Sequence, residues 1–190
     1  MKALEEKILR EGEILPGNIL KVNHFLNHQL DVDFMMEMGR EVARLYEGAG
    51  VNKILTIEAS GIAFAVAVAA HMHVPVLFAK KSSSSNMSEG KLITQVASFT
   101  HQKVYNVMVS GELLNASDRV LIVDDFLARG NAVFGLMNLV SQAGGEVVGV
   151  TAAIEKGYQG GGDKLRAQGV RVESLAVIDE MTEAGIRFRN

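Results

Sequence analysis

Apolar and polar positions follow two different patterns along this chain. Five runs of strand length, rich in Val, Ile and Leu, are typical of strands buried inside a parallel sheet. They cover residues 53–57, 74–79, 120–123, 147–154 and 170–178. The segments between them are predicted to be helices, over residues 34–46, 62–71, 133–143 and 163–168. Strands that alternate with helices in this way predict an α/β fold with right-handed parallel crossovers.

The N-terminal part carries weaker signals. Residues 1–11 have the charged, polar character of a short surface helix. Residues 13–31 are predicted to be irregular, with a turn at Pro16-Gly17-Asn18, and Asp33 is the candidate cap for the next helix. No repeat or long linker divides the chain, so residues 1–190 are predicted to form a single domain.

Composition narrows the possible classes of protein. Hydrophobic residues make up 48% of the chain and the net charge is −3, so general attraction to nucleic acid or membranes is not predicted. The absence of cysteine excludes a disulfide framework and a thiolate metal site. The wholly apolar run Ile62–Ala70 is too short to cross a bilayer, and the charged N-terminus does not resemble a signal peptide. We therefore expect a soluble cytoplasmic protein.

The most informative stretch begins with the four apolar residues Val120–Val123, which Asp124 and Asp125 follow directly. Ligands of open α/β sheets bind at the carboxyl ends of strands. Backbone N–H groups of the next loop can hold a phosphate, and the two carboxylates suit sugar hydroxyls or a metal carried with the ligand. An ordinary strand with an acidic end is the alternative. The loop comprises Ala128, Arg129, Gly130, Asn131 and Ala132.

This stretch resembles the signature of the type I phosphoribosyltransferases, which bind phosphoribosyl diphosphate through two acidic residues and a small-residue loop. The resemblance implies the type I fold, a mostly parallel sheet flanked by helices. It also implies a small hood, formed largely by residues 1–32 together with C-terminal segments. Many members have threonine at the positions of Arg129 and Ala132. The phosphate loop here would therefore depend on backbone N–H groups, with help from Arg129.

A second loop at the same sheet edge is predicted to bind the diphosphate. Its four residues join a strand directly to a helix, as the pyrophosphate loop of the family does, although a plain turn is the alternative. In the family this position often contains a strained or cis peptide, for which Ala59-Ser60 is the candidate. The loop comprises Glu58, Ala59, Ser60 and Gly61.

Two adjacent lysines end the next strand, and Lys81 is favoured over Lys80 to neutralise the departing diphosphate. A solvated lysine pair is the alternative. The resemblance implies a flexible loop, about residues 81–103, that closes over the substrate. The low-complexity serine run from Ser82 belongs to it, and residues 93–99 and 104–110 are predicted to pair as a hairpin.

The base-binding side is implied by a resemblance to bacterial xanthine phosphoribosyltransferases that extends over nearly the whole chain. Segments 19–29, 154–159 and 171–175 carry it. Lys156, at the end of a predicted strand, can donate to a carbonyl oxygen of the base, or it is a surface lysine. Phe126 either stacks on the base or lies in the core. The residues implied to contact the purine are Leu20, Asn27, Lys156 and Phe126.

Together these features predict a purine-salvage enzyme that converts xanthine and phosphoribosyl diphosphate to xanthosine 5′-monophosphate and diphosphate. Asp124 and Asp125 are the predicted catalytic residues, and Mg²⁺ is the implied cofactor, held mainly by substrate oxygens and water. Some 6-oxopurine enzymes have an acid at the position of Ala128, so a side-chain general base is not predicted there. A homodimer is implied by the resemblance alone.

Other functions remain open at this point. Guanine, hypoxanthine or adenine can replace xanthine as the base in the same chemistry. A phosphoribosyltransferase-like regulator without turnover would be expected to have a basic face or an added DNA-binding segment, and this acidic chain has neither. A nucleotide-binding dehydrogenase is disfavoured because no G-x-G-x-x-G follows a predicted strand.

Overall fold

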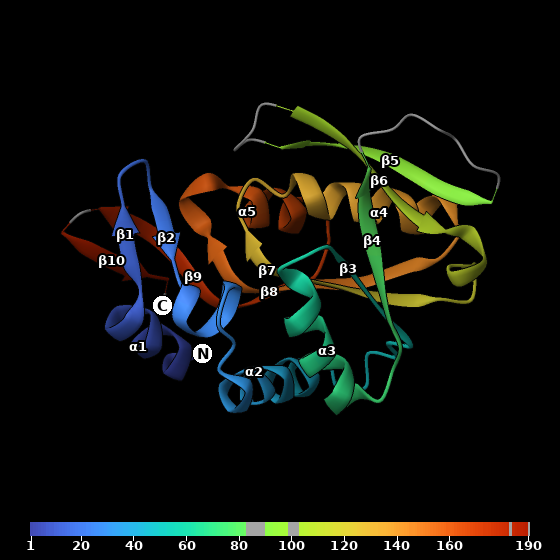
Figure 1. Cartoon of the computed structure of the whole chain (residues 1–190). Helices are drawn as coiled ribbons and strands as arrows, with labels where there is room; N and C mark the ends of the chain where they lie inside the picture. Colours follow the sequence, from blue (N-terminus) through green and yellow to red (C-terminus); the bar gives the residue numbers. More distant parts are fainter. Residues whose placement is uncertain (83–89, 99–102, 183, 190) are drawn as a thin grey trace.

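An eight-stranded sheet forms the centre of the computed structural model, which describes residues 1–82, 90–98, 103–182 and 184–189 (Figure 1). The strand order is β10-β9-β8-β7-β3-β4-β6-β5. The five middle strands are parallel, and antiparallel pairs close both edges. The predicted mostly parallel sheet is therefore confirmed. The strands are β3 Lys53–Ile57, β4 Val76–Ser82, β5 Lys91–Ser98, β6 Lys103–Ser110, β7 Arg119–Leu127, β8 Glu146–Lys156, β9 Val172–Thr182 and β10 Gly185–Phe188.

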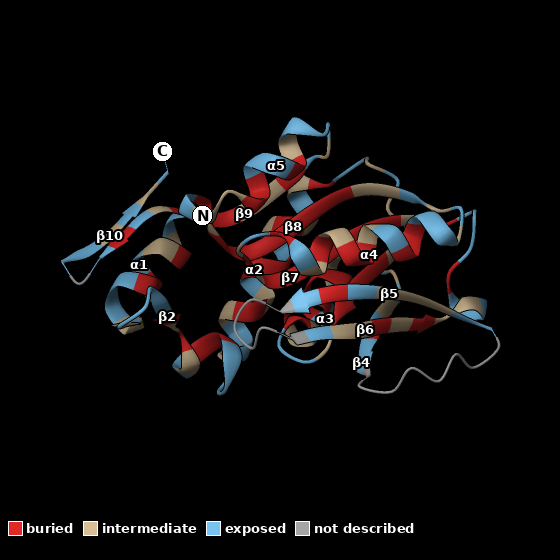
Figure 2. Cartoon of the chain, turned by 90° about the horizontal axis from the view of Figure 1, so that it is seen from above, coloured by how far each residue is buried: buried red, intermediate tan, exposed pale blue. Residues whose placement is uncertain are grey.

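Helices cover both faces of the sheet (Figure 1). One face carries α2 Val32–Leu45 and α3 Gly61–Met72, and the other carries α4 Asn131–Gln142 and α5 Gly161–Ala167. The first four apolar residues of β7 alternate between the two cores, with Leu121 and Val123 on the α2–α3 side and Val120 and Ile122 on the α4 side. Burial on both faces explains the unbroken apolar run (Figure 2). Within the described residues, no helix is long and apolar enough to cross a membrane.

The N-terminal segment contains more regular structure than its sequence predicts. After α1 Lys2–Glu11, β1 Glu13–Leu15 and β2 Ile19–Lys21 form an antiparallel hairpin, and a π-helical turn follows at Asn23–Asn27. The prediction that residues 13–31 are irregular is wrong, because three-residue strands are too short to show a periodic pattern.

The cap of α2 is also corrected. Asp31, rather than Asp33, accepts a hydrogen bond from the Phe34 N–H at 3.2 Å, because the helix begins one residue before Asp33. The Lys7 ammonium donates to Asp31 at 2.8 Å and lies 5.1 Å from the centroid of the Phe34 ring. This contact fixes α1 against the beginning of α2.

Two of the other shifts in strand boundaries have a clear physical reason. β4 begins at Val76, two residues later than predicted, because Pro75 has no N–H for the ladder. β9 runs on to Thr182 because the tail returns beside it as β10, where Ile186 pairs with Met181.

The segment after β4 is partly regular. The predicted hairpin is confirmed as β5–β6, with a 3₁₀ turn at Gly111–Leu113 beyond it. Residues 91–98 of the expected flexible loop therefore form a strand. Residues 83–89 and 99–102, which include most of the serine run, lie outside the described residues.

Both ends of the chain are bound to β9. The amino group of Met1 donates to the Leu175 carbonyl, and the Arg189 N–H donates to the Val177 carbonyl at 2.8 Å. The two ends therefore lie on the same side of the molecule (Figure 1). The N-terminal hairpin lies beside the carboxyl end of β8, where Lys156 donates to the Asn18 carbonyl.

Candidate functional site

The site lies at the point in the sheet where the order of strand addition reverses. The chain passes from β3 to β4 on one side and from β7 to β8 on the other, although β3 and β7 are neighbours. β3 pairs with β7 only from Lys53↔Val120 to Leu55↔Ile122, whereas β7 remains paired with β8 as far as Leu127. The carboxyl end of β7 is thus open on its β3 side. Such a switch point is where open α/β sheets bind ligands.

Two carboxylates occupy this opening. Asp124 and Asp125 lie within β7 and are only 7% and 6% exposed. The Asp125 N–H donates to Asp124 Oδ1 at 2.9 Å. Burial, and then the adjacent Asp125 charge, raise the pKa of the Asp124 carboxyl well above its ordinary value. Asp124 therefore retains a proton more readily than an exposed aspartate does.

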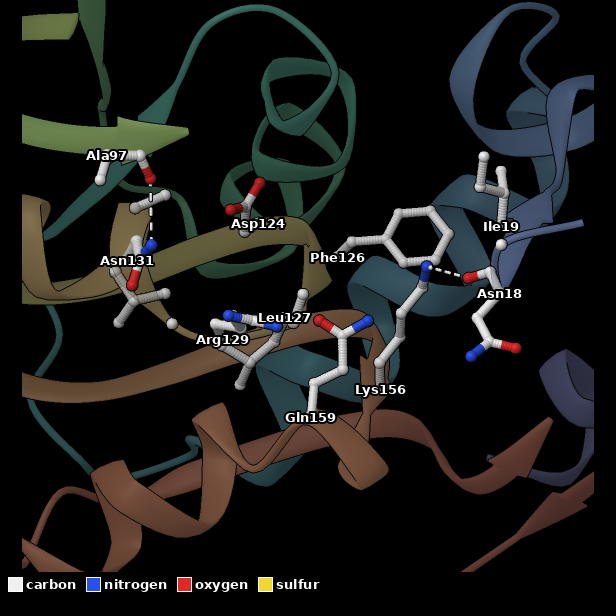
Figure 3. Close-up of a pocket in the computed structure, with 15 residues that line it drawn as sticks. Asn18, Ile19, Ala97, Asp124, Phe126, Leu127, Arg129, Asn131, Lys156 and Gln159 are labelled. Atoms are coloured by element: carbon white, nitrogen blue, oxygen red, sulfur yellow. Dashed lines mark hydrogen bonds between the residues drawn. The ribbon is translucent and has the colours of Figure 1, made fainter. Parts of the chain in front are cut away.

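Asp124 belongs to the walls of two cavities. The first, of about 450 Å³, extends along Ala128–Ala132 to Lys156 and the β1–β2 turn (Figure 3). The second, of about 420 Å³, extends past Asp125 to Lys81 and Tyr105. The two cavities also share Ala97 and Ala132. A ligand with groups on both sides of a central sugar can therefore span them with the sugar beside Asp124.

The predicted phosphate loop lies between β7 and α4. Gly130 has a φ of 84°, a left-handed conformation that turns the chain into α4. The Gly161 N–H donates to the Ala128 carbonyl at 3.1 Å from behind the loop. Any Cβ at Gly161 would overlap that carbonyl and the Gly130 nitrogen. The loop is therefore supported by the beginning of α5 at a distance that only glycine allows.

A buried ion pair holds α5 in place. Both terminal guanidinium nitrogens of Arg166 donate to the Glu155 carboxylate at 2.8 Å, and Ser174 Oγ donates to it at 2.6 Å. Glu155 is fully buried, so its charge depends on these partners. The pair fixes the helix that supports the phosphate loop.

Side chains of the loop have further contacts. Arg129 is exposed at the cavity wall, and Asn131 donates through Nδ2 to the Ala97 carbonyl of β5 at 3.0 Å (Figure 3). The Asn131 side chain thus connects α4 to the β5–β6 hairpin, and its backbone N–H lies at the beginning of α4.

The second cavity contains the predicted diphosphate loop. Glu58 accepts a hydrogen bond from the Lys81 N–H at 2.6 Å, and Glu58 and Ser60 line the wall. The cis peptide lies between Glu58 and Ala59, so its prediction at Ala59-Ser60 is wrong by one residue. Glu58 is the last residue bonded to β4, through its N–H to Ala79, and the chain leaves the sheet directly after it.

Gly61 begins α3 beside Asp124. A Cβ there would lie 2.5 Å from Thr56 Oγ1 and 2.9 Å from Asp124 Oδ1, so the close approach requires glycine. Of the two lysines at the end of β4, Lys81 lines this cavity. Lys80 lies 5.9 Å from the Phe78 ring centroid and lines a separate hollow.

Lys156 and Phe126 meet at the far end of the first cavity. The Lys156 ammonium lies 5.6 Å from the Phe126 ring centroid and donates to the Asn18 carbonyl at 3.2 Å (Figure 3). Burial lowers the pKa of Lys156. Phe126 is half-buried, so one part of it packs against the core while another lines the cavity.

The two other residues implied to contact the base are placed differently. Leu20 is only 6% exposed and packs in the core, whereas its neighbour Ile19 is 51% exposed and lines the cavity. Asn27 donates through Nδ2 to Asp125 Oδ2 at 2.9 Å. In this structure Asn27 therefore contacts the carboxylate pair, and neither Leu20 nor Asn27 is part of the first cavity's wall.

Sequence reasoning did not assign several residues that line these cavities, among them Asn18, Ile19, Gln159 and Tyr105. Three come from short elements, because Asn18 and Ile19 belong to the unrecognised β1–β2 hairpin and Gln159 to a 3₁₀ turn at Gly157–Gln159. Tyr105 could have been found, because it lies two residues before Val107 in a predicted strand. Residues at this spacing share a face, and both line the second cavity.

Comparison with known proteins gives a consistent result. Residues 34–180 match the family model described as the phosphoribosyl transferase domain. Xanthine phosphoribosyltransferase 1 of Clostridium perfringens (strain 13) is 51% identical over 190 residues, which cover all of both chains. Xanthine phosphoribosyltransferase of Clostridioides difficile (strain 630) is 50% identical with the same coverage.

A solved structure also resembles this one. The APRTase from Giardia lamblia, complexed with 9-deazaadenine, aligns with a TM-score of 0.78 at 18% identity. The alignment covers 94% of this chain and 98% of that one. At this identity the likeness concerns the fold, and the predicted type I fold is confirmed.

The Asp124 carboxyl group should lower the stability of the protein at neutral pH. An acid whose pKa is raised in the folded state binds its proton more tightly there than in the unfolded chain, where an aspartate has a pKa of about 3.9. Stability therefore falls as pH rises from that value through the folded pKa. Asp124→Asn does not ionise, and its Oδ1 can still accept from the Asp125 N–H.

We expect Asp124→Asn to be more stable than the wild type at pH 8, with an advantage that shrinks as the pH falls toward 4. Thermal unfolding across this range measures the effect. Asp33→Asn is the control, because Asp33 is exposed in the first turn of α2 and its loss should give no such gain. An Asp124→Asn protein less stable than the wild type at pH 8 would contradict the argument.

Proposed function

The chain belongs to the phosphoribosyltransferase family, and on this premise we propose that it is a xanthine phosphoribosyltransferase. It converts xanthine and phosphoribosyl diphosphate to xanthosine 5′-monophosphate and diphosphate. The observation that carries this proposal is the position of Asp124, at the junction of a cavity beside the phosphate loop and a cavity beside Lys81. The names of the curated relatives support xanthine as the base.

Each part of phosphoribosyl diphosphate has a group of residues that can bind it. Backbone N–H groups of Ala128–Ala132 bind the 5-phosphate at the beginning of α4. Asp124 and Asp125 accept hydrogen bonds from the ribose hydroxyls. The diphosphate lies in the second cavity, against Glu58–Gly61 and the Lys81 ammonium. The base occupies the end of the first cavity, between Phe126 and Lys156.

The reaction replaces one bond at C1 of the sugar with another. Purine N9 donates an electron pair to C1, while the bond from C1 to the diphosphate oxygen breaks and its electron pair leaves with the diphosphate. The nitrogen proton is lost to solvent, or is already absent when the base is ionised. The two buried carboxylates stabilise the positive charge that develops on the sugar, and Lys81 stabilises the negative charge that develops on the diphosphate.

We propose that Mg²⁺ accompanies the substrate. The described part of the chain has no group of three or more His, Cys, Asp or Glu side chains able to hold a metal. The paired carboxylates Asp124 and Asp125 are nevertheless oxygen ligands of the kind that Mg²⁺ accepts beside phosphates. These residues fit a metal that is held mainly by the diphosphate and water. When bound, it would neutralise charge on the diphosphate.

The first experiment follows product formation from phosphoribosyl diphosphate and Mg²⁺ with xanthine, guanine, hypoxanthine and adenine in parallel. We expect the largest kcat/KM for xanthine. The double variant Asp124→Asn with Asp125→Asn should lose turnover while remaining folded. A preference for another base would overturn xanthine and keep the chemistry. Binding of phosphoribosyl diphosphate without turnover on any base would indicate a regulator instead.

Gly161→Ala tests the support behind the phosphate loop. Its Cβ must displace the Ala128 carbonyl, so the loop shifts relative to Asp124. We expect kcat/KM for phosphoribosyl diphosphate to fall about 10- to 100-fold, as for a misplacement of about 1 Å. Lys164→Ala, on the exposed side of the same helix, should leave it unchanged. Equal kinetics for the two variants would show that the loop is not positioned from behind.

The resemblance also leads us to propose a homodimer and a cytoplasmic location. Exposed apolar side chains such as Val66 and Phe78 are consistent with a contact between copies. Sedimentation equilibrium should give twice the mass of the 20.5 kDa chain, and a monomer at micromolar concentration would contradict the dimer. Cell fractionation tests the location.

A further inference from the structure

The turn between β1 and β2 has an uncommon backbone conformation. Gly17 and Asn18 have φ angles of 84° and 59°, both in the left-handed region. Glycine reaches this region freely and asparagine tolerates it, whereas other L residues are rarely found there. Both residues line the first cavity, where the turn faces the end of β8 (Figure 3).

The Asn18 carbonyl of this turn is contacted by two side chains from a distant part of the chain. The Lys156 ammonium donates to the Asn18 carbonyl at 3.2 Å, and the Tyr158 hydroxyl lies 3.5 Å from the same oxygen. The contact therefore depends on the direction of a backbone carbonyl. The Asn18 side chain matters mainly because it permits the conformation that gives this direction.

Few other interactions fix the position of the Lys156 ammonium. Among the described residues it forms no ion pair, and the Asn18 carbonyl is its one hydrogen-bond acceptor. Its ammonium also lies over the Phe126 ring, at 5.6 Å from the centroid. An ammonium group has three donors, so the bond to Asn18 leaves two for a ligand in the cavity.

We propose that Asn18 is a positioning residue for base recognition, whose left-handed backbone presents the carbonyl that aims the Lys156 ammonium at the purine. The inference rests on the proposed function, in which Lys156 donates to a carbonyl oxygen of the base. It assigns to the N-terminal turn a role in base affinity, in addition to enclosing the cavity. In this proposal the side chain that contacts the base is Lys156, and Asn18 acts through it.

Three substitutions separate backbone conformation from side-chain chemistry. Asn18→Val disfavours the left-handed conformation, whereas Asn18→Gly retains both the conformation and the carbonyl. His73→Val is the matched control, because His73 has a φ of 56° at the end of α3 and does not line either cavity. It introduces the same backbone cost away from the site.

Steady-state kinetics with xanthine and phosphoribosyl diphosphate provides the test. For Asn18→Val we expect the KM for xanthine to rise about 5- to 30-fold, the factor that corresponds to the cost of a left-handed L residue. The KM for phosphoribosyl diphosphate should stay within about twofold, because the phosphate loop is not touched. Asn18→Gly and His73→Val should both keep the xanthine KM of the wild type.

A double-mutant cycle with Lys156→Ala tests whether the two residues act together. Lys156→Ala alone should raise the xanthine KM, and adding Asn18→Val should then have little further effect, because the lysine to be positioned is gone. Effects that multiply would assign Asn18 an independent role and overturn the inference. It would also be overturned by a normal xanthine KM for Asn18→Val, or by an equal loss in Asn18→Gly.

Failure of this inference is distinguishable from failure of the proposed function. If the wild type does not use xanthine, the proposed function is wrong. If Lys156→Ala leaves the KM for xanthine unchanged, the proposed contact between Lys156 and the base is wrong. If Lys156→Ala raises the KM and Asn18→Val does not, only the role of Asn18 is wrong. Thermal unfolding of each variant above the assay temperature establishes that the kinetic changes come from folded protein.

Discussion

The carboxyl end of β7 is the constraint on which the rest of the structure depends. β7 is packed on both faces, and its neighbour β3 stops pairing with it at Leu55↔Ile122. Two aspartates are thereby held in a nearly buried position beside the two cavities. Burial of ionisable groups is costly for a small protein, and such groups are concentrated at functional sites.

The elements around this strand end approach it closely through glycine. Gly61 brings α3 against Asp124, and Gly161 brings α5 against the predicted phosphate loop. The buried Glu155–Arg166 pair then fixes α5 from its other side. The N-terminal segment completes the enclosure through Asn27, which donates to Asp125. Segments far apart in sequence therefore contact the end of β7 and the loop that follows it.

The fold was predictable because the strands of a parallel sheet are long apolar runs. The position of the two aspartates also followed from the sequence, since the carboxyl end of such a strand is a binding edge. The N-terminal hairpin was not predictable, because β1 and β2 have three residues each and their apolar positions show no period. For the same reason the contact between Asn18 and Lys156 could not be foreseen, since it joins residues 138 positions apart through a backbone carbonyl.

An experimental structure with xanthosine 5′-monophosphate bound is the most direct test of the central claim. The account predicts the phosphate on the N–H groups of Ala128–Ala132, the ribose hydroxyls on Asp124 and Asp125, and the base beside Phe126 and Lys156. A phosphate bound elsewhere, or a base in the cavity beside Lys81, would contradict the assignment of the two cavities.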